Sequence, residues 1–269
     1  MFLPGTGQNA SIFQRVQQEA ARLGYHVVGL TYVSTGGLGK ACPTALDPNV
    51  CYENARLEII DGIDRGPVVD VNRANSIDNR LIKVLQYLAT QYPEEGWERF
   101  LLRGEPKWSQ IAIGGHSQGG GNAAMIAKIR LVARVVLFSS VTDSIHTDAA
   151  SWEATHITPA ERYYGIAHDR DGLYRPIRAG WDSLGLAVFG APATPETSSP
   201  PYDGTHTLVT DLTPQGGFVG TNAHGAPSND LSTPLNPDGT CCALLDAWRY
   251  LLAARTQDDD QAASAGTTR

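Results

Sequence analysis

Stretches with the composition of β-strands alternate with stretches with the spacing of α-helices along the whole chain. The strand-like stretches are 1–4, 26–33, 110–115, 133–141, 162–168 and 206–212. In the segments between them, apolar residues recur every three or four positions, as on one face of a helix. These helix-like stretches are 11–24, 54–64, 76–92, the stretch after Ser117, 175–186 and 242–255. The alternation predicts an α/β fold with a mostly parallel sheet of about six strands and helices on both faces.

The 269 residues are enough for one domain with a large core. We predict a single domain over residues 1–255, since no linker-like stretch or internal repeat divides it. The segment 142–161 is rich in turn residues and contains Trp152, and we expect it to form a small cap. Residues 256–269 are small and polar, and we predict a disordered tail there.

Composition excludes two classes of partner. The chain has 21 basic and 28 acidic residues and lacks a basic cluster of the kind that binds nucleic acid. Its longest apolar runs are much shorter than the roughly 20 residues that span a membrane. We therefore expect a soluble protein without a nucleic-acid partner or a transmembrane segment.

The four cysteines form two pairs along the chain. Cys42 and Cys51 flank a short loop that a disulfide could close, and the alternative is two free thiols. Cys241 and Cys242 are adjacent, and neighbours rarely bridge because a disulfide needs well-separated Cα atoms. No Cys or His spacing typical of zinc occurs, so a structural metal is not indicated.

The motif "GHSQG" at residues 115–119 places Ser117 between a strand-like and a helix-like stretch. It matches G-x-S-x-G, in which a nucleophilic serine occupies a sharp strand-to-helix turn and the flanking glycines let the two elements approach. The helix after Ser117 also directs its first N–H groups toward the turn, so the N–H of Gln118 is a candidate oxyanion donor. The alternative is a glycine-rich loop that only packs the helix on the strand.

With this motif and the strand–helix alternation, the sequence resembles the α/β-hydrolase superfamily, in its serine esterase and lipase branch. The resemblance covers nearly the whole chain, although only the motif around Ser117 is specific. It implies a catalytic triad in the chain order Ser, then Asp or Glu, then His. The acid should follow a strand beyond Ser117, and the histidine should come later still.

The order selects His224 as the base among seven histidines. His224 lies in a loop after the last strand-like stretch, from which it could return to Ser117. Its alternative is a solvated loop histidine. The others begin or end strands, neighbour the serine or lie in the expected cap: His26, His116, His146, His156, His168 and His206.

The acid is expected just after the stretch 162–168. The superfamily typically carries it a few residues past the strand, and Asp171, before Gly172, fits better than Asp169. Asp143, after the preceding strand, is a further candidate. The acid would accept the imidazole N–H and stabilise the imidazolium.

A second oxyanion donor is expected in the loop "LPGTGQ" after the first strand. The loop resembles the superfamily's His-Gly-x turn, with Pro4 where the histidine often stands. The N–H of Thr6 is the predicted donor, and that of Gly7 is the alternate. The superfamily also places two strands before this one, whereas this strand begins at Met1. The sheet is therefore minimal, or the sequence begins late in a longer precursor. A longer precursor, together with the Cys42/Cys51 pair, would favour export over a cytoplasmic location.

These residues predict a serine hydrolase that cleaves a carboxylic ester, on a small-molecule or lipid-like substrate, through an acyl-enzyme and without a cofactor. The alternatives are an amidase, peptidase or transacylase with the same triad, and a non-catalytic hydrolase-like binding protein. Five aromatic residues could line an acyl pocket, although such residues more often belong to the core: Trp152, Tyr163, Tyr164, Trp181 and Phe189.

Overall fold

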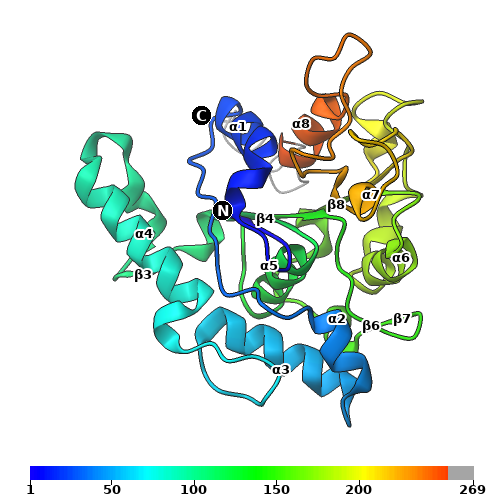
Figure 1. Ribbon diagram of the computed structural model, residues 1–269. Helices are drawn as coiled ribbons and strands as arrows, with labels where there is room; N and C mark the ends of the chain where they lie inside the picture. The colour runs from blue at the N-terminus through cyan, green and yellow to red at the C-terminus, as the bar shows by residue number, and fades with distance from the viewer. Residues whose placement is uncertain (254–269) are drawn as a thin grey trace, which may run out of the picture.

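A computed structural model describes residues 1–253. Its centre is a five-stranded sheet in which every neighbouring pair of strands is parallel (Figure 1). The strands, in spatial order, are β1 (Phe2–Leu3), β4 (Ala112–His116), β5 (Arg134–Phe138), β8 (Tyr163–His168) and β9 (Thr207–Thr210). The prediction of an α/β fold with a parallel sheet is confirmed, with one strand fewer than expected.

The missing strand is the stretch 26–33. It lies beside β1 but makes only a single bridge, between Phe2 and Gly29. Phe2 donates its N–H to Val28 O at 2.8 Å, and Leu30 donates to Phe2 O at 2.9 Å. Because β1 itself is only two residues long, it offers too few backbone groups for a longer ladder.

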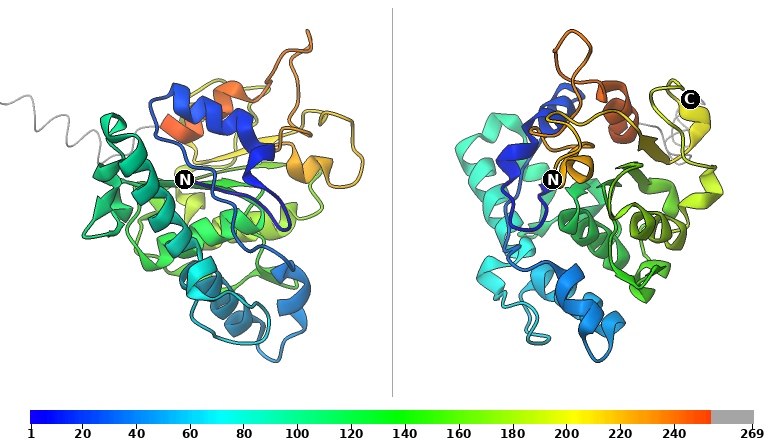
Figure 2. Two further views of the ribbon diagram at one scale, coloured as in Figure 1. Left: turned by 60° about the vertical axis from the view of Figure 1, so that its left-hand side comes forward. Right: turned by 45° about the vertical axis from the view of Figure 1, so that its right-hand side comes forward.

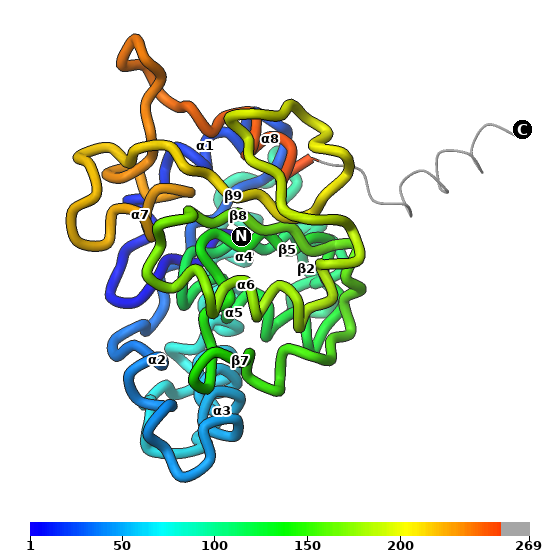
Figure 3. Tube along the Cα trace, turned by 90° about the vertical axis from the view of Figure 1, so that its right-hand side faces the viewer, coloured from blue at the N-terminus to red at the C-terminus, as the bar shows by residue number. Residues whose placement is uncertain are grey.

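Helices cover both faces of the sheet, as Figures 2 and 3 show. Successive residues of β5 point to opposite faces: Val135 and Leu137 belong to one apolar cluster, and Val136 and Phe138 belong to the other. The second cluster packs under α1 (Gln14–Arg22) and α8 (Leu245–Ala253). The first packs under α3 (Pro48–Asp61), α4 (Ile77–Gln91), α5 (Gln118–Ile129) and α6 (Tyr174–Ser183).

Two helix starts show how local chemistry sets the boundaries. Helix α4 begins after Ser76, one residue from the predicted start at 76, because Ser76 Oγ accepts the N–H of Asn79 at 3.2 Å. Helix α3 begins at Pro48, earlier than the predicted 54–64, because Asp47 caps it by accepting the N–H of Val50. Proline and the capping aspartate therefore turn part of the expected loop into helix.

The remaining elements are short. Helices α2 (Leu38–Ala41) and α7 (Asn222–Gly225) each form one turn. Two hairpins pair β2 (Leu101–Leu102) with β3 (Glu105–Pro106), and β6 (Ser144–Ile145) with β7 (Asp148–Ala149). The 3₁₀ turns are Ala10–Phe13, Cys42–Thr44, Arg73–Asn75, Pro93–Glu95, Trp97–Phe100, Trp108–Gln110, Ser151–Ala154, Ala160–Arg162, Leu186–Phe189 and Tyr202–Gly204. The segment 142–161 thus consists of one hairpin and 3₁₀ turns.

Both cysteine pairs are bonded. The expected disulfide joins Cys42 to Cys51, with the sulfur atoms 2.03 Å apart, and connects a 3₁₀ turn to the first turn of α3. Cys241 and Cys242 are also joined, although neighbouring cysteines rarely bridge. Their peptide bond is cis and their Cα atoms are 3.1 Å apart.

No helix in residues 1–253 has both the length and the apolar character that a membrane crossing needs. The predicted tail, 256–269, and the last two residues of the stretch 242–255 lie outside the described residues.

Candidate active site

Ser117 occupies the corner between β4 and α5 with an unusual backbone conformation. Its φ is 53° and its ψ is −122°, a combination that L-residues rarely adopt. The corner is fixed on both sides: Ser117 N–H donates to Phe138 O at 2.9 Å, and Ser117 O accepts from Gly121 N–H and Ser140 Oγ. A strained serine held in this way matches the geometry that the G-x-S-x-G motif requires.

The glycines of the motif are needed because two backbone segments meet at the corner. A Cβ on Gly115 would lie 2.4 Å from the carbonyl carbon of Gly119. A Cβ on Gly119 would lie 2.2 Å from Leu3 O and 2.4 Å from Pro4 O. The first turn of α5 therefore rests directly on the loop that follows β1.

His224, in α7, is hydrogen-bonded to one of the candidate acids. Its Nδ1–H donates to Asp171 Oδ2 at 2.7 Å, and the N–H of Leu173 donates to the other carboxylate oxygen at 2.9 Å. The Asp171 side chain is 1% exposed and that of His224 is 15% exposed. Because Nδ1 carries the proton of the neutral ring, Nε2 is left as a proton acceptor.

The other two candidate acids lie elsewhere. Asp169 is exposed, and its carboxylate lies 2.9 Å from His168 Nδ1. Asp143 is buried and accepts two hydrogen bonds from Arg56, at 2.5 and 2.6 Å. Within residues 1–253, neither carboxylate contacts His224.

The backbone of His224 is held beside the corner by two donors. His116 Nε2 lies 3.0 Å from His224 O, and Ser139 Oγ donates to the same oxygen at 2.7 Å. The two imidazole rings are 4.8 Å apart. His116 precedes Ser117, so this contact brings the segment that carries His224 against the corner. The sequence contained no signal for it, because the contact joins residues 108 positions apart.

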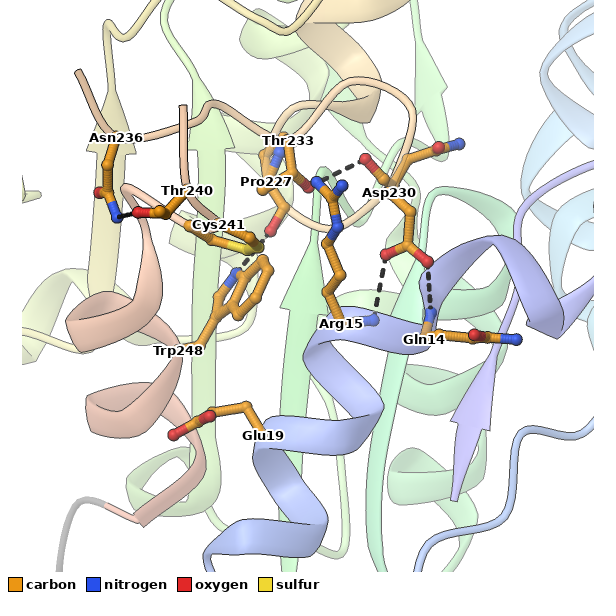
Figure 4. The surroundings of a disulfide bond; sticks show 12 residues. Gln14, Arg15, Glu19, Pro227, Asp230, Thr233, Asn236, Thr240, Cys241 and Trp248 are labelled. Atoms are coloured by element: carbon orange, nitrogen blue, oxygen red, sulfur yellow. Dashed lines mark hydrogen bonds between the residues drawn. A yellow bond between two sulfur atoms is a disulfide. The ribbon is translucent and has the colours of Figure 1, made fainter. Parts of the chain in front are cut away.

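The loop after His224 is fixed to two helices, as Figure 4 shows. Asp230 accepts the N–H groups of Gln14 and Arg15, at 2.8 and 3.1 Å, where α1 begins. A carboxylate is favourable at a helix N-terminus because unpaired N–H groups point at it. Trp248 Nε1, in α8, donates to Pro227 O at 2.8 Å. These bonds give the segment a defined path back to the sheet.

The predicted oxyanion donors lie on two linked segments. Thr6 Oγ1 donates to Gln118 Oε1 at 2.7 Å. In residues 1–253 the N–H of Thr6 has no protein acceptor. The N–H of Gln118 belongs to the first turn of α5, where N–H groups lack a partner within the helix. The alternate donor, Gly7, uses its N–H on Ser34 O at 3.1 Å. Thr6 and Gln118 therefore remain the available pair.

Ser117 opens into a cavity of about 280 Å³. Its lining residues are Thr6, Gly37, Leu38, Gly39, Lys40, Arg56, Ser117, Gln118, Thr142, Asp143 and Leu173. Two larger cavities, of about 320 and 560 Å³, contain none of the predicted site residues. The smaller cavity is therefore the one relevant to Ser117.

A buried ion pair forms part of the cavity wall. Burial alone would lower the pKa of Arg56, but the carboxylate of Asp143 outweighs that effect and holds the pKa above its ordinary value. Arg56 Nη1 also donates to Gln118 O at 3.1 Å and to Asn122 Oδ1 at 2.8 Å. A Cβ on Gly121 would lie 2.1 Å from Arg56 Nη2, so the guanidinium lies against the helix at that glycine. The ion pair thus supports the first turn of α5.

The aromatic residues considered for an acyl pocket belong to the core instead. Four are almost completely buried: Trp152, Tyr163, Tyr164 and Trp181. Phe189 stacks on His206, with the ring centroids 3.7 Å apart. None of the five lines the cavity at Ser117.

Comparison of the sequence with known protein families and with curated proteins found no match. Within residues 1–253, no group of three or more His, Cys, Asp or Glu side chains is arranged to hold a metal ion.

Proposed function

We propose that this chain is a serine hydrolase of the α/β-hydrolase superfamily that cleaves a carboxylic ester. The observation that carries the proposal is the 2.7 Å hydrogen bond from His224 to Asp171, on a segment held against the corner at Ser117. The chain order Ser, Asp, His and the position of the serine between a parallel strand and a helix support the same family.

In the proposed reaction, Ser117 Oγ attacks the ester carbonyl carbon while its proton passes to His224 Nε2. Asp171 stabilises the imidazolium that forms. The N–H groups of Thr6 and Gln118 bind the negatively charged oxygen of the tetrahedral intermediate. Collapse of the intermediate breaks the ester C–O bond, and the alcohol leaves with the proton from His224. Water, deprotonated by His224, then attacks the acyl carbon, and as the Ser117 Oγ–C bond breaks and the acid leaves, the proton returns from His224 to Ser117 Oγ.

The proposed substrate is a small-molecule or lipid-like ester. The cavity of about 280 Å³ is near the lower end of the range for ligand pockets, so we place the acyl group inside it and a longer alcohol group outside. The route needs no cofactor. Because disulfides persist in oxidising compartments, the Cys42–Cys51 bond supports placing the hydrolase outside the cytosol.

The test is hydrolysis of nitrophenyl esters of increasing acyl length by the wild type and by Ser117→Ala. We expect turnover by the wild type, greatest for short chains, and none above background for the variant. The corresponding nitroanilides separate an esterase from an amidase or peptidase with the same triad. Equal rates for the two proteins would refute the proposed mechanism.

A further inference from the structure

The imidazole of His116 contacts all three parts of the site but takes no part in the proposed reaction. Its Nε2 faces His224 O at 3.0 Å, and its Nδ1 faces Gln8 Oε1 at 3.2 Å. Gln8 Oε1 in turn accepts the N–H of Gly5 at 3.2 Å, in the loop that carries Thr6. His116 thus links the segment of the base to the loop of an oxyanion donor, next to the nucleophile.

The loop lies too close to His116 to move independently of it. A Cβ on Gly5 would lie 2.9 Å from His116 Nδ1 and 3.3 Å from Ser117 Cβ. On its other side the ring packs on Phe13, with the centroids 5.2 Å apart. The residue is 2% exposed. A ring enclosed in this way has one position, and the groups in contact with it are held in place relative to it.

The ring is neutral at ordinary pH. Burial, together with the neighbouring His224, lowers the pKa of His116 to about 3. A neutral imidazole has a single N–H. Both ring nitrogens face oxygen atoms that can only accept, and the shorter contact, 3.0 Å to His224 O against 3.2 Å to Gln8 Oε1, places that proton on Nε2, which donates it to His224 O. His116 therefore acts as a fixed hydrogen-bond donor.

We propose that His116 is a positioning residue, which sets the distance between His224 Nε2 and Ser117 Oγ by holding the backbone of His224. The inference rests on the proposed function, since it concerns the base of that reaction. Ser139 Oγ donates to the same carbonyl, so the two donors fix its position from the ends of two neighbouring strands, β4 and β5. Small errors in the placement of a catalytic group can cost on the order of 10²-fold in rate.

The test uses His116→Phe, which keeps the ring packing on Phe13 and removes both nitrogen atoms. We expect kcat to fall about 10- to 100-fold while KM changes less than twofold, because the base is misplaced and the substrate cavity is untouched. The pH at which the rate is half-maximal should stay at its wild-type value. The matched control is His206→Gln, which removes a buried histidine whose Nδ1 bonds a backbone carbonyl, Tyr163 O at 2.9 Å, outside the site.

The control should keep wild-type kcat at a similar loss of thermal stability. An unchanged kcat in a folded His116→Phe protein, or a rise in KM alone, would overturn the proposal. If His116→Phe does not fold, His116→Leu, which also lacks a hydrogen-bond donor, replaces it with the same expected fall in kcat. Ser139→Ala provides a second measurement. Because Ser139 and His116 hold the same carbonyl oxygen, that of His224, the double variant should lower kcat by a factor different from the product of the two single effects. Effects that simply multiply would contradict the shared role.

Labelling with a fluorophosphonate separates this inference from the proposed function. If the wild type is not labelled, the proposed function fails, and the inference fails with it. If the wild type is labelled and folded His116→Phe is labelled at the same rate, only the inference fails. We expect labelling of the variant to slow by the same factor as kcat.

Discussion

Glu153 is a carboxyl group buried without a partner, and replacing it with glutamine is predicted to change how stability depends on pH. The residue is 1% exposed, and in residues 1–253 neither side-chain oxygen has a hydrogen-bond partner. Burial raises the pKa of Glu153 well above its ordinary value, the carboxylate of Asp143 raises it further, and Arg56 lowers it only in part. The folded protein therefore keeps a proton that the unfolded chain releases.

The direction of the effect follows from proton binding. Below the ordinary glutamate value of 4.5, the group is protonated in both states and its contribution does not depend on pH. Above it, the unfolded chain binds fewer protons, so the free energy of unfolding falls by up to about 1.4 kcal/mol per pH unit. The loss continues until the pH passes through the raised pKa of the folded state. Glutamine cannot ionise, so Glu153→Gln should be free of this loss.

The assay is urea unfolding of the wild type and of Glu153→Gln at a series of pH values from about 5 to 8. Native proteins are usually most stable in roughly this range. We expect the variant to gain stability over the wild type as pH rises, with a slope of up to about 1.4 kcal/mol per unit. Glu58→Gln is the control, because Glu58 is equally buried but accepts the N–H groups of Arg65 and Val71. It should lose stability at neutral pH. A difference between wild type and Glu153→Gln that does not change with pH would refute the reasoning.

Three further changes test other parts of the structure. Asp171→Asn should lower kcat about 10³- to 10⁴-fold because the amide favours the wrong tautomer of the base. Asp169→Asn should leave kcat within about twofold of the wild type. The reverse pattern in steady-state kinetics would move the role of acid to Asp169. Gly121→Ala should gain about 1 kcal/mol in helix propensity but lose about 3 to 5 kcal/mol by displacing the buried guanidinium, and a net gain in urea unfolding would contradict this. In a non-reduced tryptic digest, peptide 41–56 should be lighter than its reduced form by two hydrogen atoms because Cys42 and Cys51 are bonded. Reduction of the protein should lower its free energy of unfolding by about 2 to 3 kcal/mol.

The features that the sequence could predict are those encoded locally. The position of Ser117 followed from five consecutive residues, and the parallel sheet followed from apolar runs separated by helical spacing. The pairing of Asp171 with His224 was not local: it was what the resemblance to the α/β-hydrolase superfamily implied, and the structure brings these two side chains together. The weak strand at 26–33 was over-predicted because composition does not reveal how short its neighbour β1 is.

Features that depend on distant partners could not be predicted. Arg56 lies in the helix-like stretch 54–64, and only the fold places it between Asp143 and the first turn of α5. Asp143 appeared as a candidate acid because the sequence could not show that an arginine binds it. His116 was considered only as a competing base, whereas its ring lies between two segments more than a hundred residues apart along the chain. Tertiary contacts decide each of these roles.

The most direct test of the central claim is covalent labelling of Ser117 by a fluorophosphonate, followed by intact mass and peptide mapping. The reagent phosphonylates a serine only where a base and oxyanion donors activate it. The account predicts one adduct per chain, located at Ser117 in the wild type and absent from Ser117→Ala. A wild-type protein that stays unlabelled, or a Ser117→Ala protein that is labelled equally, would contradict it.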